Sequence, residues 1–199
     1  MFMQDLTRLI ARATPMPVAR ALPRCGLVSG TLIETAQGWV RVEELRRGDL
    51  VHSFDGGLRE VVALDRDWLA PGKVELVHLA GGVMGNCADV ALMPGQALLI
   101  DCWDEPDVDG AVVALVPAAA MIGLSGTSLA QTRGATEVVI PVFAEEEVVH
   151  AQGGLLLHCP GVGSRTRHSE AGFFTRLSRE RAHQLLCKRL QQSPSLVWA

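Results

Sequence analysis

The sequence lacks three features that would each point to a particular class of protein. It contains no run of apolar residues long enough to cross a bilayer, and it has no Cys-x-x-Cys pair. It also lacks a basic excess, since 18 Lys and Arg residues stand against 22 Asp and Glu residues, for a formal net charge of −4. We therefore expect neither a membrane span nor a nucleic-acid partner, because nucleic-acid binding relies on clustered positive charge.

A disulfide framework is also missing. The five cysteines are odd in number and widely spaced: Cys25, Cys87, Cys102, Cys159 and Cys187. Such spacing fits a reducing compartment better than an oxidising one. At the N-terminus, Asp5, Arg8 and Arg12 interrupt any apolar stretch of the kind that a signal peptide needs. The sequence therefore predicts a cytoplasmic protein.

What the sequence does contain is short apolar stretches separated by turn residues. Its 199 residues are 48% hydrophobic and 20% charged, which is enough apolar material for a buried core. The 20 glycines and 10 prolines are typical of many short strands joined by tight turns. We expect one all-β domain over residues 25–161.

Turns at three glycine positions set the expected strand order. Gly38 closes a hairpin turn, Gly48 with Asp49 makes a turn in which the Asp side chain bonds the backbone, and residues 55–57 make a second hairpin. The expected strands cover residues 31–34, 39–42, 50–54, 58–65, 74–79, 90–93, 97–101, 111–116, 137–143, 147–151 and 155–158. Short helical segments are expected near residues 41–45 and 117–122.

Two arms flank the predicted β domain. Residues 1–24 read as an N-terminal amphipathic helix over residues 2–13, followed by a Pro-rich linker. Residues 162–199 read as a linker and a C-terminal helix with Ser178 as its N-cap. The apolar positions of this helix recur at helical spacing: Ala182, Leu185, Leu186 and Leu190. We expect the helix to pack on the β domain, with docking of a protein partner as the alternative.

Five short segments, taken in order, resemble the Hint domain family of hedgehog and intein proteins, and in particular the short bacterial Hint-domain proteins. The segments are Gly30–Thr31, Glu43–Leu45 with Gly48–Asp49, the turn Met93–Gln96, Leu115–Ala118, and the closing stretch from Glu147–Ala151 to His158–Gly161. The resemblance implies an all-β, horseshoe-shaped fold of two interlocked subdomains. It also implies that the two ends of the domain lie close together.

The resemblance further implies a self-processing chemistry. In active members, a Cys or Ser at the first position of the domain attacks the carbonyl of the preceding peptide bond, for which proximity is built into the chain. A donor stabilises the oxyanion, and a His in the second conserved turn protonates the departing amine. Splicing of the intein type also needs a terminal Asn, which does not follow His158 here, where Cys159 stands instead.

The site residues implied by this resemblance are Cys25, Thr31, Gln96 and His158. By the usual spacing, however, Gly26 occupies the nucleophile position and Cys25 stands one residue earlier, where a β-bulge would be needed to bring it into register. Gln96 occupies the place of the His, and an amide does not exchange a proton at neutral pH. His78, His150 and His158 are the candidates to replace it.

Two readings of the function follow from these residues. The first is a degenerate autoprocessing module that is not an enzyme and acts as a scaffold or binding module. The second is an active self-cleaving domain that uses Cys25 and cuts between Arg24 and Cys25.

The cysteines and histidines raise two other kinds of site. A Cys-dependent hydrolase built on Cys159 and His158 is excluded, because neighbours on a strand point to opposite faces. A zinc site would have to combine residues without a recognised spacing: His78, Cys87, Cys102 and His158. We therefore expect no metal and no cofactor.

Overall fold

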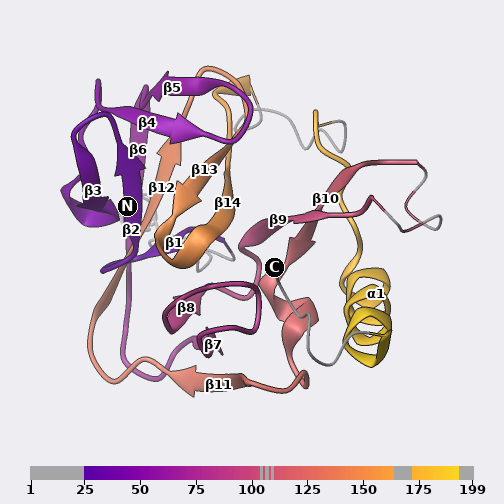
Figure 1. Ribbon diagram of the computed structural model, residues 1–199. Coiled ribbons are helices and arrows are strands. Elements are labelled where there is room, and N and C mark those ends of the chain that lie inside the picture. The colour runs from indigo at the N-terminus through magenta and orange to yellow at the C-terminus, as the bar shows by residue number, and fades with distance from the viewer. Residues whose placement is uncertain (1–24, 104, 106–107, 109, 164–171, 193–199) are drawn as a thin grey trace, which may run out of the picture.

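The computed structural model describes residues 25–103, 105, 108, 110–163 and 172–192 (Figure 1). The predicted N-terminal helix over residues 2–13 lies outside these residues. The strands are β1 Leu27–Val28, β2 Leu32–Thr35, β3 Gly38–Arg41, β4 Leu50–Ser53, β5 Gly57–Glu60, β6 Ala63–Leu69, β7 Glu75–Leu79, β8 Val90–Leu92, β9 Ala97–Asp101, β10 Val113–Pro117, β11 Thr127–Gln131, β12 Thr136–Val142, β13 Glu147–Ala151 and β14 Leu155–Cys159. The helical segments are η1 Val42–Glu44, η2 Ala118–Met121, η3 Gln152–Gly154 and α1 Arg179–Gln192.

Within the described residues the strands form three antiparallel sheets. The largest runs β10-β9-β14-β13-β2-β4-β5, with β3 paired to β2. A second sheet has the order β1-β12-β6, and a third has the order β11-β7-β8. In Figure 1 the third sheet lies at the opposite end of the molecule from β3, β4 and β5, and β6 and β12 run between the two ends. The predicted all-β class with a C-terminal helix is confirmed.

The turns that the glycines predicted are present. Gly38 has a φ of 104° in the β2–β3 hairpin, a region that other residues rarely adopt. The carboxylate of Asp49 accepts the N–H of Arg46 at 2.7 Å, as the Gly48–Asp49 turn predicted. The second hairpin pairs Ser53 with Gly57. These turns place β2, β4 and β5 side by side.

The predicted strand over residues 58–65 is wrong, because the chain changes sheets inside it. β5 pairs with β4 and ends at Glu60, whereas β6 begins at Ala63 and pairs with β12. Between them, Val61 is fully buried and bonds the turn at Gly48 and Asp49, and the N–H of Val62 donates to Val142. β11, which sequence analysis missed, pairs with β7.

The C-terminal helix packs on the β domain, as expected. Ser178 caps α1, since its side-chain oxygen accepts the N–H of Arg181 at 3.2 Å. Ala182, Leu185 and Leu186 are buried in the same core as strand residues of the large sheet. The helix contacts η2 and β10. These three apolar positions of the helix are therefore covered by its own domain.

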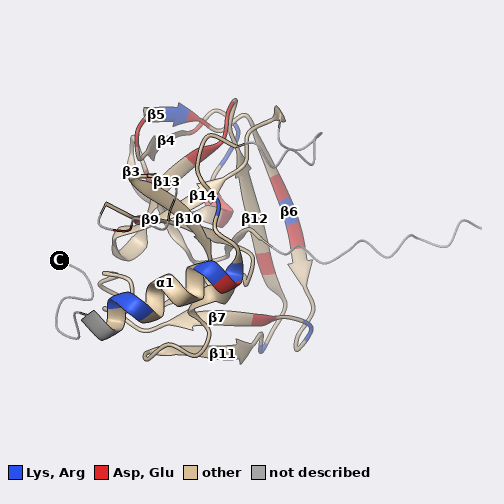
Figure 2. Ribbon diagram, turned by 90° about the vertical axis from the view of Figure 1, so that its right-hand side faces the viewer, with Lys and Arg blue, Asp and Glu red and all other residues tan. Residues whose placement is uncertain are grey.

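Basic and acidic residues are interspersed along the elements drawn in Figure 2. Asp65, Arg66 and Asp67 alternate along β6, and basic and acidic residues both occur on α1 (Figure 2). Such interspersed charge is typical of a solvated face. Among the described residues, no helix combines the length and the apolar character needed to cross a membrane.

Candidate functional site

The two ends of the β domain meet at an open pocket of about 100 Å³. Cys25 and Gly26, at the entry to β1, line it together with His158, at the end of β14. Gln96 and Arg176 line it as well. The expected closeness of the two ends is therefore confirmed, and three of the four candidate residues share one pocket.

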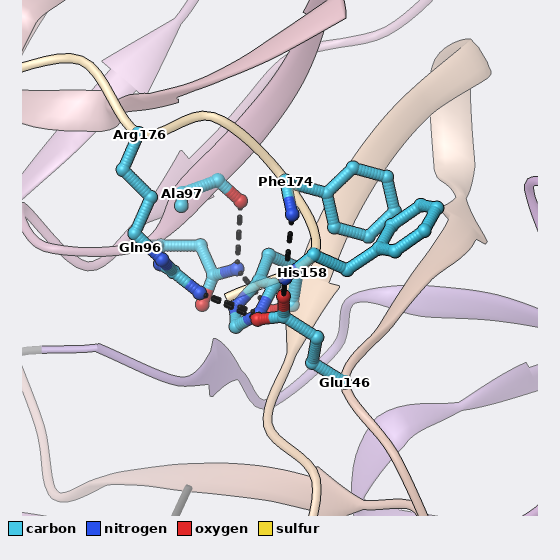
Figure 3. A network of polar contacts seen from close by, with 7 residues as sticks. Gln96, Ala97, Glu146, His158, Phe174 and Arg176 are labelled. Atoms are coloured by element: carbon cyan, nitrogen blue, oxygen red, sulfur yellow. Dashed lines mark hydrogen bonds and ion pairs between the residues drawn. The ribbon is translucent and has the colours of Figure 1, made fainter. Parts of the chain in front are cut away.

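Gln96 holds these two ends together. Its side-chain oxygen accepts the backbone N–H of Gly26 at 3.1 Å. Its side-chain nitrogen donates to the carbonyl oxygens of Ala97 at 3.0 Å and His158 at 2.9 Å (Figure 3). Since a backbone N–H only donates and a carbonyl only accepts, these partners fix the orientation of the amide. Both N–H groups of the buried side chain are thus occupied, and neither is directed at an oxyanion.

Gly26 lies in a position that excludes a side chain. Its φ is 129°, and a Cβ built there would lie 2.4 Å from Cγ1 of Val138 and 3.0 Å from Cγ1 of Ile140. Real Cβ atoms do not approach side chains so closely, so β12 fills the space that a nucleophile at this position would need. The absence of a nucleophilic side chain at Gly26 therefore agrees with the packing of β12 against this position.

Cys25 places its thiol near the pocket but in a poorly solvated setting. Although the residue as a whole is exposed, the burial of its thiol raises the pKa, and the nearby charge of Arg176 opposes the shift only in part. The thiolate is the nucleophilic form of cysteine, so a raised pKa lowers reactivity at neutral pH. Burial raises the pKa of Cys159 as well.

His158 belongs to a cluster with Glu146 and Arg176. Arg176 Nη2 lies 2.9 Å from both Glu146 Oε2 and His158 Nε2, and the imidazole nitrogen lies 3.1 Å from the same carboxylate oxygen (Figure 3). A guanidinium group only donates and a carboxylate only accepts, so a neutral ring meets one of these two contacts at a time: without a proton on Nε2 it accepts from Arg176, and with a proton there it donates to Glu146.

The electrostatics of this cluster agree with a neutral imidazole. Burial lowers the pKa of His158, and the charge of Arg176 lowers it further, to about 4, against the opposing effect of Glu146. Burial would raise the pKa of Glu146, but its contacts with His158 and Arg176 outweigh burial and hold the pKa below its ordinary value. At neutral pH the cluster is therefore an ion pair beside an uncharged ring.

Glu146 also fixes the segment that precedes α1. Its Oε1 accepts the backbone N–H groups of Phe173 and of Phe174, the latter at 3.3 Å. The two phenyl rings pack edge to face with their centroids 5.0 Å apart. Three residues after Phe174, the N–H of Leu177 donates to the carbonyl oxygen of Leu115 in β10 at 2.9 Å. The segment is thereby held against the mouth of the pocket.

The remaining candidates lie elsewhere. Thr31 is buried, and its hydroxyl donates to the carbonyl oxygen of Val28 at 2.7 Å, which stabilises the turn between β1 and β2. His78 on β7 and His150 on β13 are not among the residues that line the pocket. Within the part of the chain that the structure describes, no three His, Cys, Asp or Glu side chains gather to hold a metal ion, so the four residues weighed for zinc do not form a site.

Sequence analysis missed Glu146 and Arg176 as residues of the site. Glu146 stands in an acidic run that reads as a turn, and Arg176 lies in a segment assigned to a linker. Glu146 and Arg176 are 30 residues apart, so no local sequence pattern predicts that they form a pair.

Comparison with known proteins gives a family match over most of the β domain. The Hint domain family matches residues 25–156. Comparison with curated proteins finds no sequence match.

Several solved inteins and intein-like domains resemble the structure. A bacterial intein-like domain from Clostridium thermocellum is 17% identical, with a TM-score of 0.45 over 68% of this chain and 99% of that one. The gp41-1 intein is 14% identical, with a TM-score of 0.40 over 67% of this chain and 98% of that one. A zinc-bound splicing domain of the Msm DnaB1 intein is 17% identical, with a TM-score of 0.40 over 67% and 98%.

Proposed function

Because the chain belongs to the Hint domain family, we propose that it keeps the fold without processing itself and serves as a scaffold or binding module. The observation that carries this proposal is the position of Gln96, whose oxygen accepts the N–H of Gly26. A nitrogen that leaves a peptide bond has to gain a proton. At Gly26 the contacting group is an amide oxygen, which has no proton to give.

The state of the neighbouring histidine supports the same conclusion. With a pKa of about 4, His158 is uncharged at neutral pH and offers no imidazolium to a leaving amine. Its Nε2 is engaged by Arg176 and Glu146, so this nitrogen is not directed at the start of β1. The thiol of Cys25 is held protonated by its own surroundings.

An active self-cleaving domain is the second candidate, and one observation favours it. Cys25 and His158 line the same pocket. A thiol next in sequence to the Arg24 carbonyl has proximity to it built into the chain. In this candidate, Cys25 attacks that carbonyl, the peptide nitrogen of Cys25 leaves, and thiol or water releases residues 1–24.

Intact mass spectrometry separates the two candidates. We expect the full-length mass to persist during long incubation at neutral pH, with and without added thiol or hydroxylamine. Loss of residues 1–24 that is accelerated by thiol and abolished in Cys25→Ala would contradict the proposal and support self-cleavage.

A Gln96→His variant tests the explanation for inactivity. An imidazole in place of the amide restores the missing type of proton donor but not the nucleophile at Gly26. We expect this variant also to keep its full mass. If it loses residues 1–24 while the wild type does not, the deficit lies in the proton donor alone, and Cys25 is positioned well enough to attack.

A further inference from the structure

A cysteine and a histidine form a hydrogen-bonded pair on α1, away from the pocket. Cys187 Sγ lies 3.4 Å from Nε2 of His183. The two residues are four positions apart, so they lie on the same side of the helix, and both are partly buried between α1 and the β domain. The function proposed above makes no use of this pair.

The imidazole of His183 is oriented by a third group. Its Nδ1 lies 2.7 Å from the backbone carbonyl oxygen of Ala120 in η2. Since a carbonyl only accepts, Nδ1 carries the proton, and in the neutral ring Nε2 presents its lone pair to the thiol of Cys187. A nucleophile, a base and a group that orients the base are the parts that activate a cysteine.

Packing holds these three parts in place. Ala118, Ala120 and Met121 of η2 are buried, as are Ala182 and Leu186 of α1. The carbonyl and the imidazole therefore belong to two elements that meet in one core.

The charged neighbours of Cys187 are already paired. Lys188 and Arg189 both contact the carboxylate of Glu105, at 3.1 and 3.3 Å. The thiol of Cys187 is instead within hydrogen-bonding distance of the imidazole of His183.

The other cysteines differ from Cys187. Cys102 and Cys159 are buried, and burial raises the pKa of both as well as that of Cys25. Cys87 is exposed. Among the described residues, Cys187 is the cysteine whose thiol is hydrogen-bonded to an imidazole.

We propose that Cys187 is a reactive thiol that forms mixed disulfides with low-molecular-weight disulfides, with His183 as its base. The S–H bond breaks and its proton passes to Nε2 of His183. The sulfur then attacks one sulfur of the disulfide, a new S–S bond forms, and the other sulfur leaves as a thiolate that takes up the proton. No electrons are gained or lost overall, because the incoming disulfide is reduced as Cys187 is oxidised.

The test uses the full chain and oxidised glutathione at neutral pH, with the adduct on each cysteine followed by peptide mass mapping. We expect Cys187 to react at least about tenfold faster in the wild type than in His183→Gln, because positioned bases contribute that much or more. Cys87 serves as the internal control and should react equally in both proteins. Equal rates at Cys187, with α1 still folded by circular dichroism, would overturn the proposal.

A second measurement needs no variant. The rate at Cys187 in the native wild type is compared with the rate at the same residue in protein unfolded in urea, each scaled to a reference cysteine peptide in the same solvent. We expect the native rate to be higher despite partial burial. A lower native rate would mean that burial dominates and that His183 does not act as a base, and the proposal would fail on that result as well.

Discussion

At the scale of single residues, His158 is a histidine kept neutral by its surroundings. Its side chain is 12% exposed and its pKa is about 4, compared with 6.5 in an unfolded chain. Burial and Arg176 both penalise the imidazolium form. Protonation of His158 therefore destabilises the folded state.

This state predicts a loss of stability in mild acid. Between about pH 6.5 and pH 4 the unfolded chain binds a proton at His158 that the folded chain does not, so the free energy of unfolding falls as the pH falls. The full loss is on the order of 3 kcal/mol, from 1.36 kcal/mol per pKa unit. Glu146 acts in the same direction below about pH 4.5, because its lowered pKa means that folding favours its charged form. Urea unfolding across this pH range measures the effect.

A His158→Gln variant is the matched control. It keeps an acceptor for Arg176 but has no group that titrates in this range. We expect the dependence of stability on pH between about 6.5 and 4 to become shallower in the variant. An unchanged slope would show that His158 is not the residue responsible.

The residues of the site were predicted from the sequence to different degrees. Gly26 and Gln96 were identified by their positions in two motifs, and both lie at the pocket. What Gln96 binds was not predictable, because its partners are backbone groups at residues 26 and 158, far away in the chain. Thr31 was identified by motif, but its hydrogen bond is local and belongs to a turn.

At the scale of elements, the side chain of Glu146 makes several of the contacts that hold the segment before α1 on the β domain. Glu146 accepts the N–H groups of Phe173 and Phe174 and pairs with Arg176. Gly172 packs against the same carboxylate, since a Cβ at that position would lie 2.5 Å from Glu146 Oε1. These contacts of Glu146 add to the two backbone hydrogen bonds that Leu115 makes with the same segment.

We predict that Glu146→Ala loosens this segment while leaving the β domain folded. Loss of these charge-assisted hydrogen bonds costs on the order of 1–2 kcal/mol locally. Hydrogen exchange at the amide of Leu177 should therefore be faster by roughly tenfold. Glu145→Ala is the control, because Glu145 is exposed and adjacent. Equal exchange at Leu177 in both variants would contradict the assignment.

Strands were predicted best where turn residues bounded them. The hairpins at Gly38 and at residues 55–57 were recognised because glycine and aspartate are specific to turns. β11 was missed because its sequence, Thr-Ser-Leu-Ala-Gln, lacks the alternation of a half-buried strand, and its Leu129 is 43% exposed. The change of sheets after Glu60 was missed because two successive valines look like a continuing strand.

At the scale of the whole molecule, Gln96 connects the start of the domain to its end. One buried amide bonds Gly26 ahead of β1, Ala97 in β9 and His158 in β14. These elements belong to two different sheets. The amide of Gln96, which stands in the pocket where a proton donor would be needed, therefore also joins the two sheets.

We predict that Gln96→Ala destabilises the protein by about 1–3 kcal/mol, because it leaves one N–H and two carbonyl groups without their partner. Denaturant unfolding measures this change. Gln37→Ala is the matched control, since Gln37 lies exposed in the β2–β3 turn and its removal should change the free energy of unfolding by less than about 0.5 kcal/mol. Similar losses in the two variants would rule out the connecting role of Gln96.

The parallel contact between Leu115 and Arg176 has a consequence for how copies of the protein meet. β10 is the outermost strand on its side of the large sheet, and both backbone groups of Leu115 are bonded by the segment that leads into α1. An exposed edge strand has unpaired N–H and C=O groups that can pair with a strand of another molecule and start aggregation. The segment that holds the helix in place occupies both backbone groups of Leu115, so these groups in the middle of β10 are not open to a strand of a second copy.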